Sequence, residues 1–140
     1  LDAIGQIDRL PEKVQDQLAK TKETLSKNDG LTLVLALSYG ARQEMIDATK
    51  AIAAKVQKGE IIPNQIDDAV ISDHLYTHSI PDPELLIRTS GEMRISNFLL
   101  WQISYAELVI TETLWPDFRA PQLYDALEAY AKRHRRFGKV

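Results

Sequence analysis

Three short apolar runs alternate with helical patterns along the chain, and this alternation restricts it to an α/β fold. The runs cover residues 31–37, 85–88 and 108–111. Continuous apolar runs of this length are typical of strands covered on both faces, as in parallel sheets. We therefore predict a mainly parallel sheet flanked by helices. Sheets usually contain about four to six strands, so we expect the missing strands upstream of Leu1.

Apolar side chains recur at helical spacing in the segments between and beyond these runs. A segment that is apolar nearly all round indicates a buried helix, and one with a single apolar face indicates a surface helix. Residues 96–106 are apolar nearly all round, so we predict a buried helix there. Ser96 is its expected N-cap, because serine commonly occupies that position. The predicted helices cover residues 10–28, 42–57, 64–75 and 96–106, and a last helix begins at Pro121.

Length and composition predict one soluble domain over residues 1–140. The net charge of −3 provides no global positive field for nucleic acid. The absence of cysteine excludes disulfides and fits a reducing, cytoplasmic location. No apolar segment is long enough to span a membrane. Since the chain begins with Leu1 rather than methionine, we expect it to be part of a longer protein.

The segment after residue 88 combines features suited to a diphosphate. Arg88 ends an apolar run, Gly91 and Arg94 lie in the following polar loop, and Ser96 starts the predicted buried helix. Two guanidinium groups and a helix N-terminus suit a ligand with several phosphate oxygens. The alternative is that the arginines pair with Glu92 or Glu84 at the surface.

Glu107 lies just before the third apolar run, where an unpaired carboxylate would be costly if buried. Mg²⁺ held together with substrate phosphates would satisfy it, and so would an arginine; the sequence leaves both open. On one straight helix, Ser96 and Glu107 would lie about 16 Å apart. In a symmetric dimer, Glu107 of one subunit could then reach toward the loop after residue 88 of the other subunit. His74 and His78 have zinc-compatible spacing, but a solvent-facing pair is favoured because no HExxH pattern is present.

Several segments together closely resemble the cis-prenyltransferase family. The resemblance is carried by residues 87–107, by Leu-Trp-Pro-Asp-Phe at 114–118 and by Arg-Arg-Phe-Gly at 135–138. The turn at 38–42 is also similar, although the family often has asparagine and a second glycine where this chain has Ser38 and Ala41. The resemblance covers all 140 residues as the C-terminal portion of the family's catalytic domain.

The resemblance implies an enzyme that condenses isopentenyl diphosphate onto an allylic diphosphate such as farnesyl diphosphate. The new double bonds are cis, the product is undecaprenyl diphosphate for cell wall biogenesis, and Mg²⁺ is the cofactor. By residue match, Arg88, Arg94 and Ser96 would bind the diphosphate of isopentenyl diphosphate, and Glu107 would help place Mg²⁺. Met93 stands where the family often has histidine or another polar residue.

The resemblance also implies a homodimer and contact with a membrane through the lipid product. Arg136 and Gly138 match a tail that crosses the dimer interface to reach the partner's phosphates. The family's Asp-Gly-Asn-Gly-Arg-Trp loop, which carries its essential magnesium-binding aspartate, does not occur in residues 1–140. We therefore expect the 1–140 polypeptide alone to be inactive. The alternatives are a non-catalytic partner subunit and a generic anion-binding domain.

Overall fold

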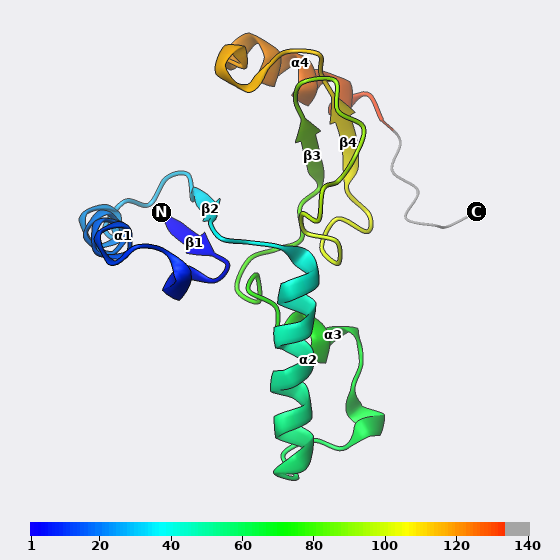
Figure 1. Ribbon diagram of the computed structural model, residues 1–140. Coiled ribbons are helices and arrows are strands. Elements are labelled where there is room, and N and C mark those ends of the chain that lie inside the picture. The colour runs from blue at the N-terminus through cyan, green and yellow to red at the C-terminus, as the bar shows by residue number, and fades with distance from the viewer. Residues whose placement is uncertain (134–140) are drawn as a thin grey trace. The chain divides into compact units, whose positions relative to one another are not determined.

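The computed structural model describes residues 1–133, which form an α/β fold (Figure 1). The chain divides into two compact units, Leu1–Pro81 and Asp82–Val140, and each has its own pair of parallel strands. The parallel pairing in both units confirms the predicted fold class. The assignment of the whole chain to one domain stays a prediction. No helix within residues 1–133 is both long and apolar enough to cross a membrane.

The first unit begins with a strand–helix–strand arrangement. Strand β1 (Asp2–Ile4) and strand β2 (Val34–Ala36) pair in parallel, with Ala3 opposite Leu35. Between them the chain forms a 3₁₀ turn over Ile7–Arg9 and helix α1 (Glu12–Leu25). The predicted strand at 31–37 and helix at 10–28 are confirmed with shorter bounds. Strand β1 was not predicted, because three residues are too few to give a periodic signal.

Helix α2 (Ala41–Gln57) provides the buried core of the first unit. Its buried positions are Ala41, Glu44, Ala48 and Ile52, whose spacing of three or four residues places them on one face. A 3₁₀ turn at Pro63–Gln65 and helix α3 (Asp68–Ser72) follow, and α3 packs against α2. The helix predicted over 64–75 is therefore confirmed only in its middle, although Leu75 is buried.

A buried polar network joins α2 to the turn that follows α3. Glu44 is only 1% exposed, and its carboxylate accepts the Tyr39 hydroxyl at 2.5 Å and the Tyr76 backbone N–H at 2.9 Å. The Tyr76 hydroxyl donates to Asp47, which also accepts a hydrogen bond from Gln43 at 2.9 Å. Buried carboxylates need such partners, so this network fixes the packing of α2.

The second unit is built on strands β3 (Leu85–Arg88) and β4 (Glu107–Ile110). They pair in parallel, with Leu85 opposite Glu107 and Arg88 opposite Ile110. A 3₁₀ turn at Trp115–Asp117 leads to helix α4 (Ala120–Ala131), which packs against β4. Both predicted strands are confirmed to within one residue, and the last predicted helix is confirmed with a start one residue earlier, at Ala120.

The predicted helix over 96–106 is wrong, because this segment forms consecutive turns. Ser96, Asn97 and Leu99 have φ values of 53°, 61° and 46°, which belong to the left-handed region. Such residues cannot continue a right-handed hydrogen-bond ladder. Only separate bonds form, such as Ile103 N–H to the Leu99 carbonyl at 3.0 Å. Ile103 is buried, at 8% exposed, whereas Leu100 and Tyr105 are exposed, so the apolar segment is buried only in part. The 16 Å separation expected on a straight helix no longer applies.

The contact between Tyr76 and Asp47 makes stability depend on pH. The hydrogen bond from Tyr76 lowers the pKa of Asp47 below its ordinary 3.8. Burial of the Tyr76 hydroxyl, together with its hydrogen bond to the Asp47 carboxylate, raises the pKa of Tyr76 to about 12. We predict that Tyr76→Phe lowers the free energy of unfolding by about 1–3 kcal/mol near neutral pH. Urea denaturation measures this value, with the exposed Tyr124→Phe as the control.

Urea denaturation repeated across pH checks whether the lower free energy of unfolding of Tyr76→Phe comes from the contact with Asp47. The Asp47 contribution is complete above pH 3.8 and is lost as pH falls through its lowered pKa. The Tyr76 contribution is complete below pH 10.0 and is lost as pH rises through about 12. The deficit of Tyr76→Phe relative to the parent protein should shrink in both directions. A deficit that stays constant across pH would contradict the assignment.

Candidate anion-binding site

Backbone hydrogen bonds fix the position of Arg88 at the end of β3. The Arg88 carbonyl accepts the Thr111 N–H at 2.9 Å, and the N–H groups of Ser90 and Gly91 donate to the carbonyls of Thr113 and Thr111, both at 2.9 Å. The loop after β3 is thus tied to the chain that follows β4. These two loop N–H groups are occupied by carbonyls, so they are not available to an anion at this site.

Arg88 and Arg94 line the same cavity, as the sequence predicted. The cavity has a volume of about 250 Å³ and is otherwise apolar; its lining residues are Leu86, Ile87, Arg88, Arg94, Ile95 and Phe98. Both arginines also border a smaller cavity of about 40 Å³, next to Leu108 and Ile110. The two arginines therefore border the same partly open, largely apolar space within the second unit.

The two arginines differ in how their charge is satisfied. The Nε atom of Arg88 is buried and has no hydrogen-bond partner among residues 1–133. Leaving a buried donor unpaired is costly, and an anionic ligand would remove that cost. Arg94 is 64% exposed and forms an ion pair with Glu92, one of the alternatives that the sequence left open. Such exposed pairs contribute only about 0–1 kcal/mol, so a ligand can replace Glu92.

Ser96 does not have the capping role predicted for it. Its φ of 53° is left-handed, whereas an N-cap residue has an extended backbone, and no helix follows it. Its side chain is exposed and is not among those lining the two cavities. The expected helix N-terminus is thus absent from this part of the described chain, and the anion site depends on the two guanidinium groups.

Glu107 has an arginine partner in the structure. Its Oε2 atom accepts Arg133 Nη1 at 2.6 Å, and Arg133 Nη2 donates to the Leu108 carbonyl at 2.8 Å. Within residues 1–133, no three His, Asp or Glu side chains are grouped as metal ligands. Mg²⁺ needs oxygen ligands at near-octahedral positions, and a carboxylate held by a guanidinium does not fit that requirement as it stands. A metal role for Glu107 stays a prediction.

The remaining predicted metal and phosphate residues are not brought together. Helix α3 ends at Ser72, so His74 and His78 lie in turns, where their Nδ1 atoms contact the carbonyls of Val70 at 2.6 Å and Leu75 at 3.2 Å. His74 is half-buried and only His78 is exposed, so the solvent-facing description fits one of them. Arg136 and Gly138 lie outside the described residues.

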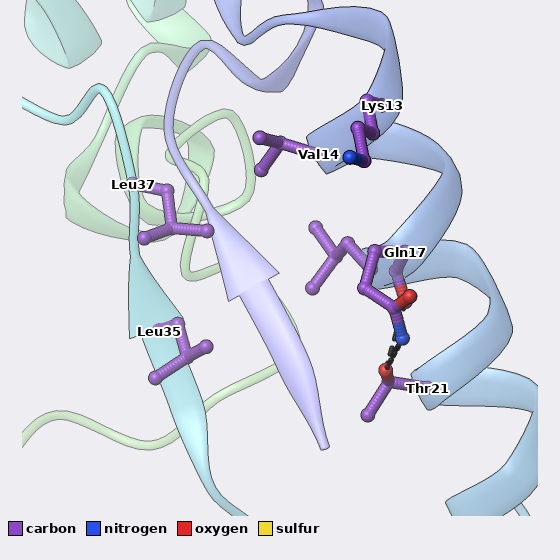
Figure 2. A pocket seen from close by; sticks show the side chains of 7 residues that line it. Lys13, Val14, Gln17, Thr21, Leu35 and Leu37 are labelled. Atoms are coloured by element: carbon purple, nitrogen blue, oxygen red, sulfur yellow. Dashed lines mark hydrogen bonds between the residues drawn. The ribbon is translucent and has the colours of Figure 1, made fainter.

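An apolar groove in the first unit was not located by sequence reasoning. It lies between α1 and the chain around β2 and has a volume of about 440 Å³ (Figure 2). Leu35 and Leu37 line one wall, and Val14 and Leu18 line the other. The resemblance implies an apolar tunnel, for which apolar residues of the strands and of the helix at 42–57 are candidates, without indicating which of them line it. The alternation of leucines at 31–37 was the signal for the groove.

Comparisons with known proteins identify the family. A family model described as putative undecaprenyl diphosphate synthase matches residues 1–138. The chain belongs to the cis-prenyltransferase family. The resemblance inferred from the motifs is therefore confirmed. An isoprenyl transferase of Porphyromonas gingivalis is 55% identical to this family member over 138 residues, which are 99% of this chain and 54% of that protein.

Two further cis-prenyltransferases are informative. The ditrans,polycis-undecaprenyl-diphosphate synthase of Micrococcus luteus, named as (2E,6E)-farnesyl-diphosphate specific, is 47% identical over 99% of this chain and 55% of its own length. The crystal structure of lavandulyl diphosphate synthase from Lavandula x intermedia, in complex with dimethylallyl diphosphate, matches with a TM-score of 0.95 and 43% identity. That match covers 99% of this chain and 59% of the plant protein. The chain spans about half the length of the curated relatives it matches.

Gly91 should be required for the shape of the arginine loop. Its φ is +65°, and a Cβ at this position would overlap the Glu112 carboxylate. We predict that Gly91→Ala lowers the free energy of unfolding by about 1–2 kcal/mol, because left-handed backbone is costly for alanine. Chemical denaturation measures the loss. Gly59→Ala, with φ +73° but open space, isolates the backbone cost, and Gly30→Ala should cost least. Equal losses at Gly91 and Gly30 would contradict the prediction.

Proposed function

We propose that this chain contributes the isopentenyl diphosphate site of a cis-prenyltransferase. In the proposed reaction, isopentenyl diphosphate is condensed onto an allylic diphosphate such as farnesyl diphosphate, and repeated cis additions give undecaprenyl diphosphate. The observation that carries the proposal is the cavity at the end of β3, where Arg88 has a buried, unpartnered Nε and Arg94 has only a surface ion pair. The names of the relatives support the reaction class.

In the proposal, the charged and the apolar residues of the cavity have separate roles. The guanidinium groups of Arg88 and Arg94 would bind the diphosphate, because planar forks match phosphate oxygens. Ile87, Ile95 and Phe98 would contact the short hydrocarbon and exclude water from it. In this proposal the residues orient the alkene for attack on the allylic carbon and supply no nucleophile. Ser96, two residues after Arg94, is the proposed hydroxyl donor to the same diphosphate.

The proposal for the whole protein also contains the other expectations from the sequence. Mg²⁺ is the proposed cofactor, although the Glu107 carboxylate is held by Arg133 in the structure. Arg136 and Gly138 are the proposed dimer tail, with a homodimer as the assembly. The proposed location is cytoplasmic, with peripheral membrane contact through the lipid product. The apolar groove lined by Leu35 and Leu37 is the proposed site for isoprenoid hydrocarbon in the first unit.

Replacing the two arginines tests the diphosphate site. We predict that Arg88→Met and Arg94→Met each weaken binding of isopentenyl diphosphate by about 10- to 100-fold, which corresponds to loss of a charge-assisted hydrogen bond. Arg88→Met should cost more, because its Nε is buried. Isothermal titration of the purified protein measures both. Arg119→Met is the control, since Arg119 is exposed and donates to the neighbouring Phe118 carbonyl.

The titration also separates the proposal from its alternatives. Inorganic pyrophosphate should bind more weakly than isopentenyl diphosphate, because it leaves the apolar lining of the cavity uncovered. Equal affinities would favour a generic anion-binding domain. Unchanged affinity in both arginine variants would overturn the proposed site.

The 1–140 polypeptide should not synthesise polyprenyl diphosphates by itself. The proposed essential aspartate of the Asp-Gly-Asn-Gly-Arg-Trp loop is not in this sequence. The experiment incubates purified 1–140 with Mg²⁺, farnesyl diphosphate and labelled isopentenyl diphosphate and looks for extractable labelled lipid. A protein that carries that loop should produce lipid under the same conditions. Turnover by residues 1–140 would show that the catalytic groups are already present.

A further inference from the structure

The ion pair of Glu92 with Arg94 places a carboxylate of the protein itself on one of the two arginines of the anion site. The Oε2 atom of Glu92 accepts a hydrogen bond from Nη1 of Arg94, two residues later in the loop after β3. Both residues also border the cavity of about 40 Å³, together with Arg88. A negatively charged side chain therefore lies beside the guanidinium groups that would bind the proposed diphosphate.

This ion pair does not hold the fold together. The Arg94 side chain is 64% exposed and the Glu92 side chain is 37% exposed, so water screens the attraction between them. The pair connects two residues of one loop, whereas the pair of Glu107 with Arg133 joins β4 to the chain after α4. Separating Glu92 from Arg94 therefore leaves the pairing of β3 with β4 intact.

Glu92 satisfies only one of the two arginines. Its carboxylate pairs with Arg94, whereas the buried Nε atom of Arg88 has no partner among residues 1–133. A carboxylate offers two oxygen atoms and one negative charge, and a diphosphate offers more of both, so it can serve two guanidinium groups at once. A diphosphate thus gains the Arg88 contact that Glu92 does not make.

A second carboxylate lies beside the same loop without pairing with its arginines. A Cβ atom placed on Gly91 would lie 2.4 Å from the Oε2 atom of Glu112, so this carboxylate is next to the loop backbone. Within the part of the chain that the structure describes, Glu112 forms no ion pair with Arg88 or Arg94. Glu112 therefore has the charge and the neighbourhood of Glu92 but lacks its contact.

From this geometry we infer that Glu92 is a built-in competitor of the diphosphate. It occupies Arg94 in the free protein and leaves when the ligand binds, because two anionic groups at one guanidinium repel each other. Glu92 thereby lowers the affinity of the site, and its neutralisation strengthens binding. The inference rests on the proposed function only in taking the cavity of Arg88 and Arg94 as the diphosphate site.

Isothermal titration with isopentenyl diphosphate tests the competition. We expect Glu92→Gln to bind about two- to five-fold more tightly than the parent protein, the size typical of one exposed ion pair. Glu112→Gln should give a smaller gain, because it removes a nearby charge but no contact with Arg94. Glu128→Gln changes the net charge equally, but Glu128 pairs with Lys132 on the surface of α4, so the affinity should not change.

A double variant separates competition from other effects of Glu92. In an Arg94→Met background, Glu92→Gln should no longer strengthen binding, because the carboxylate has lost the group for which it competes. A gain that persists in this background would overturn the inference. Unchanged or weaker binding by Glu92→Gln would also overturn it, and weaker binding would show that Glu92 positions Arg94 for the ligand.

The parent protein distinguishes failure of this inference from failure of the proposed function. If the parent binds isopentenyl diphosphate and Glu92→Gln binds it no more tightly, only the competitor role is wrong. If neither protein binds isopentenyl diphosphate or inorganic pyrophosphate, the diphosphate site and the competitor role are both wrong. Thermal unfolding should give the same midpoint for Glu92→Gln and the parent, since the ion pair joins no second element of the fold.

Discussion

The parallel pairing of β3 with β4 is the constraint on which the candidate site depends. This pairing places Arg88 opposite Ile110 and brings the following loop to the backbone of Thr111 and Thr113. The N–H groups of Ser90 and Gly91 are satisfied there, and Arg88 and Arg94 line the cavity. Ligand sites in parallel sheets commonly lie at the carboxyl ends of strands, and this site follows that rule.

The same strand pair explains why charge is distributed unevenly around the site. The carboxyl end of β3 carries the buried Arg88 Nε without an acceptor, whereas the first residue of β4, Glu107, has its carboxylate held by Arg133. One end of the pair therefore has an unsatisfied donor and the other a satisfied acceptor. An anionic ligand is therefore favoured at the first end.

Membership of the cis-prenyltransferase family gives these observations a chemical context. The family match extends over residues 1–138, but the chain spans only about half of the curated relatives' length. In the proposal the described residues position the substrate, and the loop that carries the family's essential aspartate does not occur in residues 1–140. This division fits a reaction in which the chain supplies electrostatics and orientation.

The sequence by itself determined the elements whose signals are local. Apolar runs and helical spacing predicted strands β3 and β4 and helices α1, α2 and α4. The motif resemblance predicted that Arg88 and Arg94 serve the same site, and both line one cavity. Tertiary structure decided the rest. Residues 96–106 have the apolar spacing of a helix, yet the left-handed backbone at Ser96, Asn97 and Leu99 prevents a continuous helix. Ile103 is buried in the turns that form instead. The partner of Glu107 is 26 residues away, and long-range contacts of this kind depend on how α4 packs on β4 rather than on any local pattern.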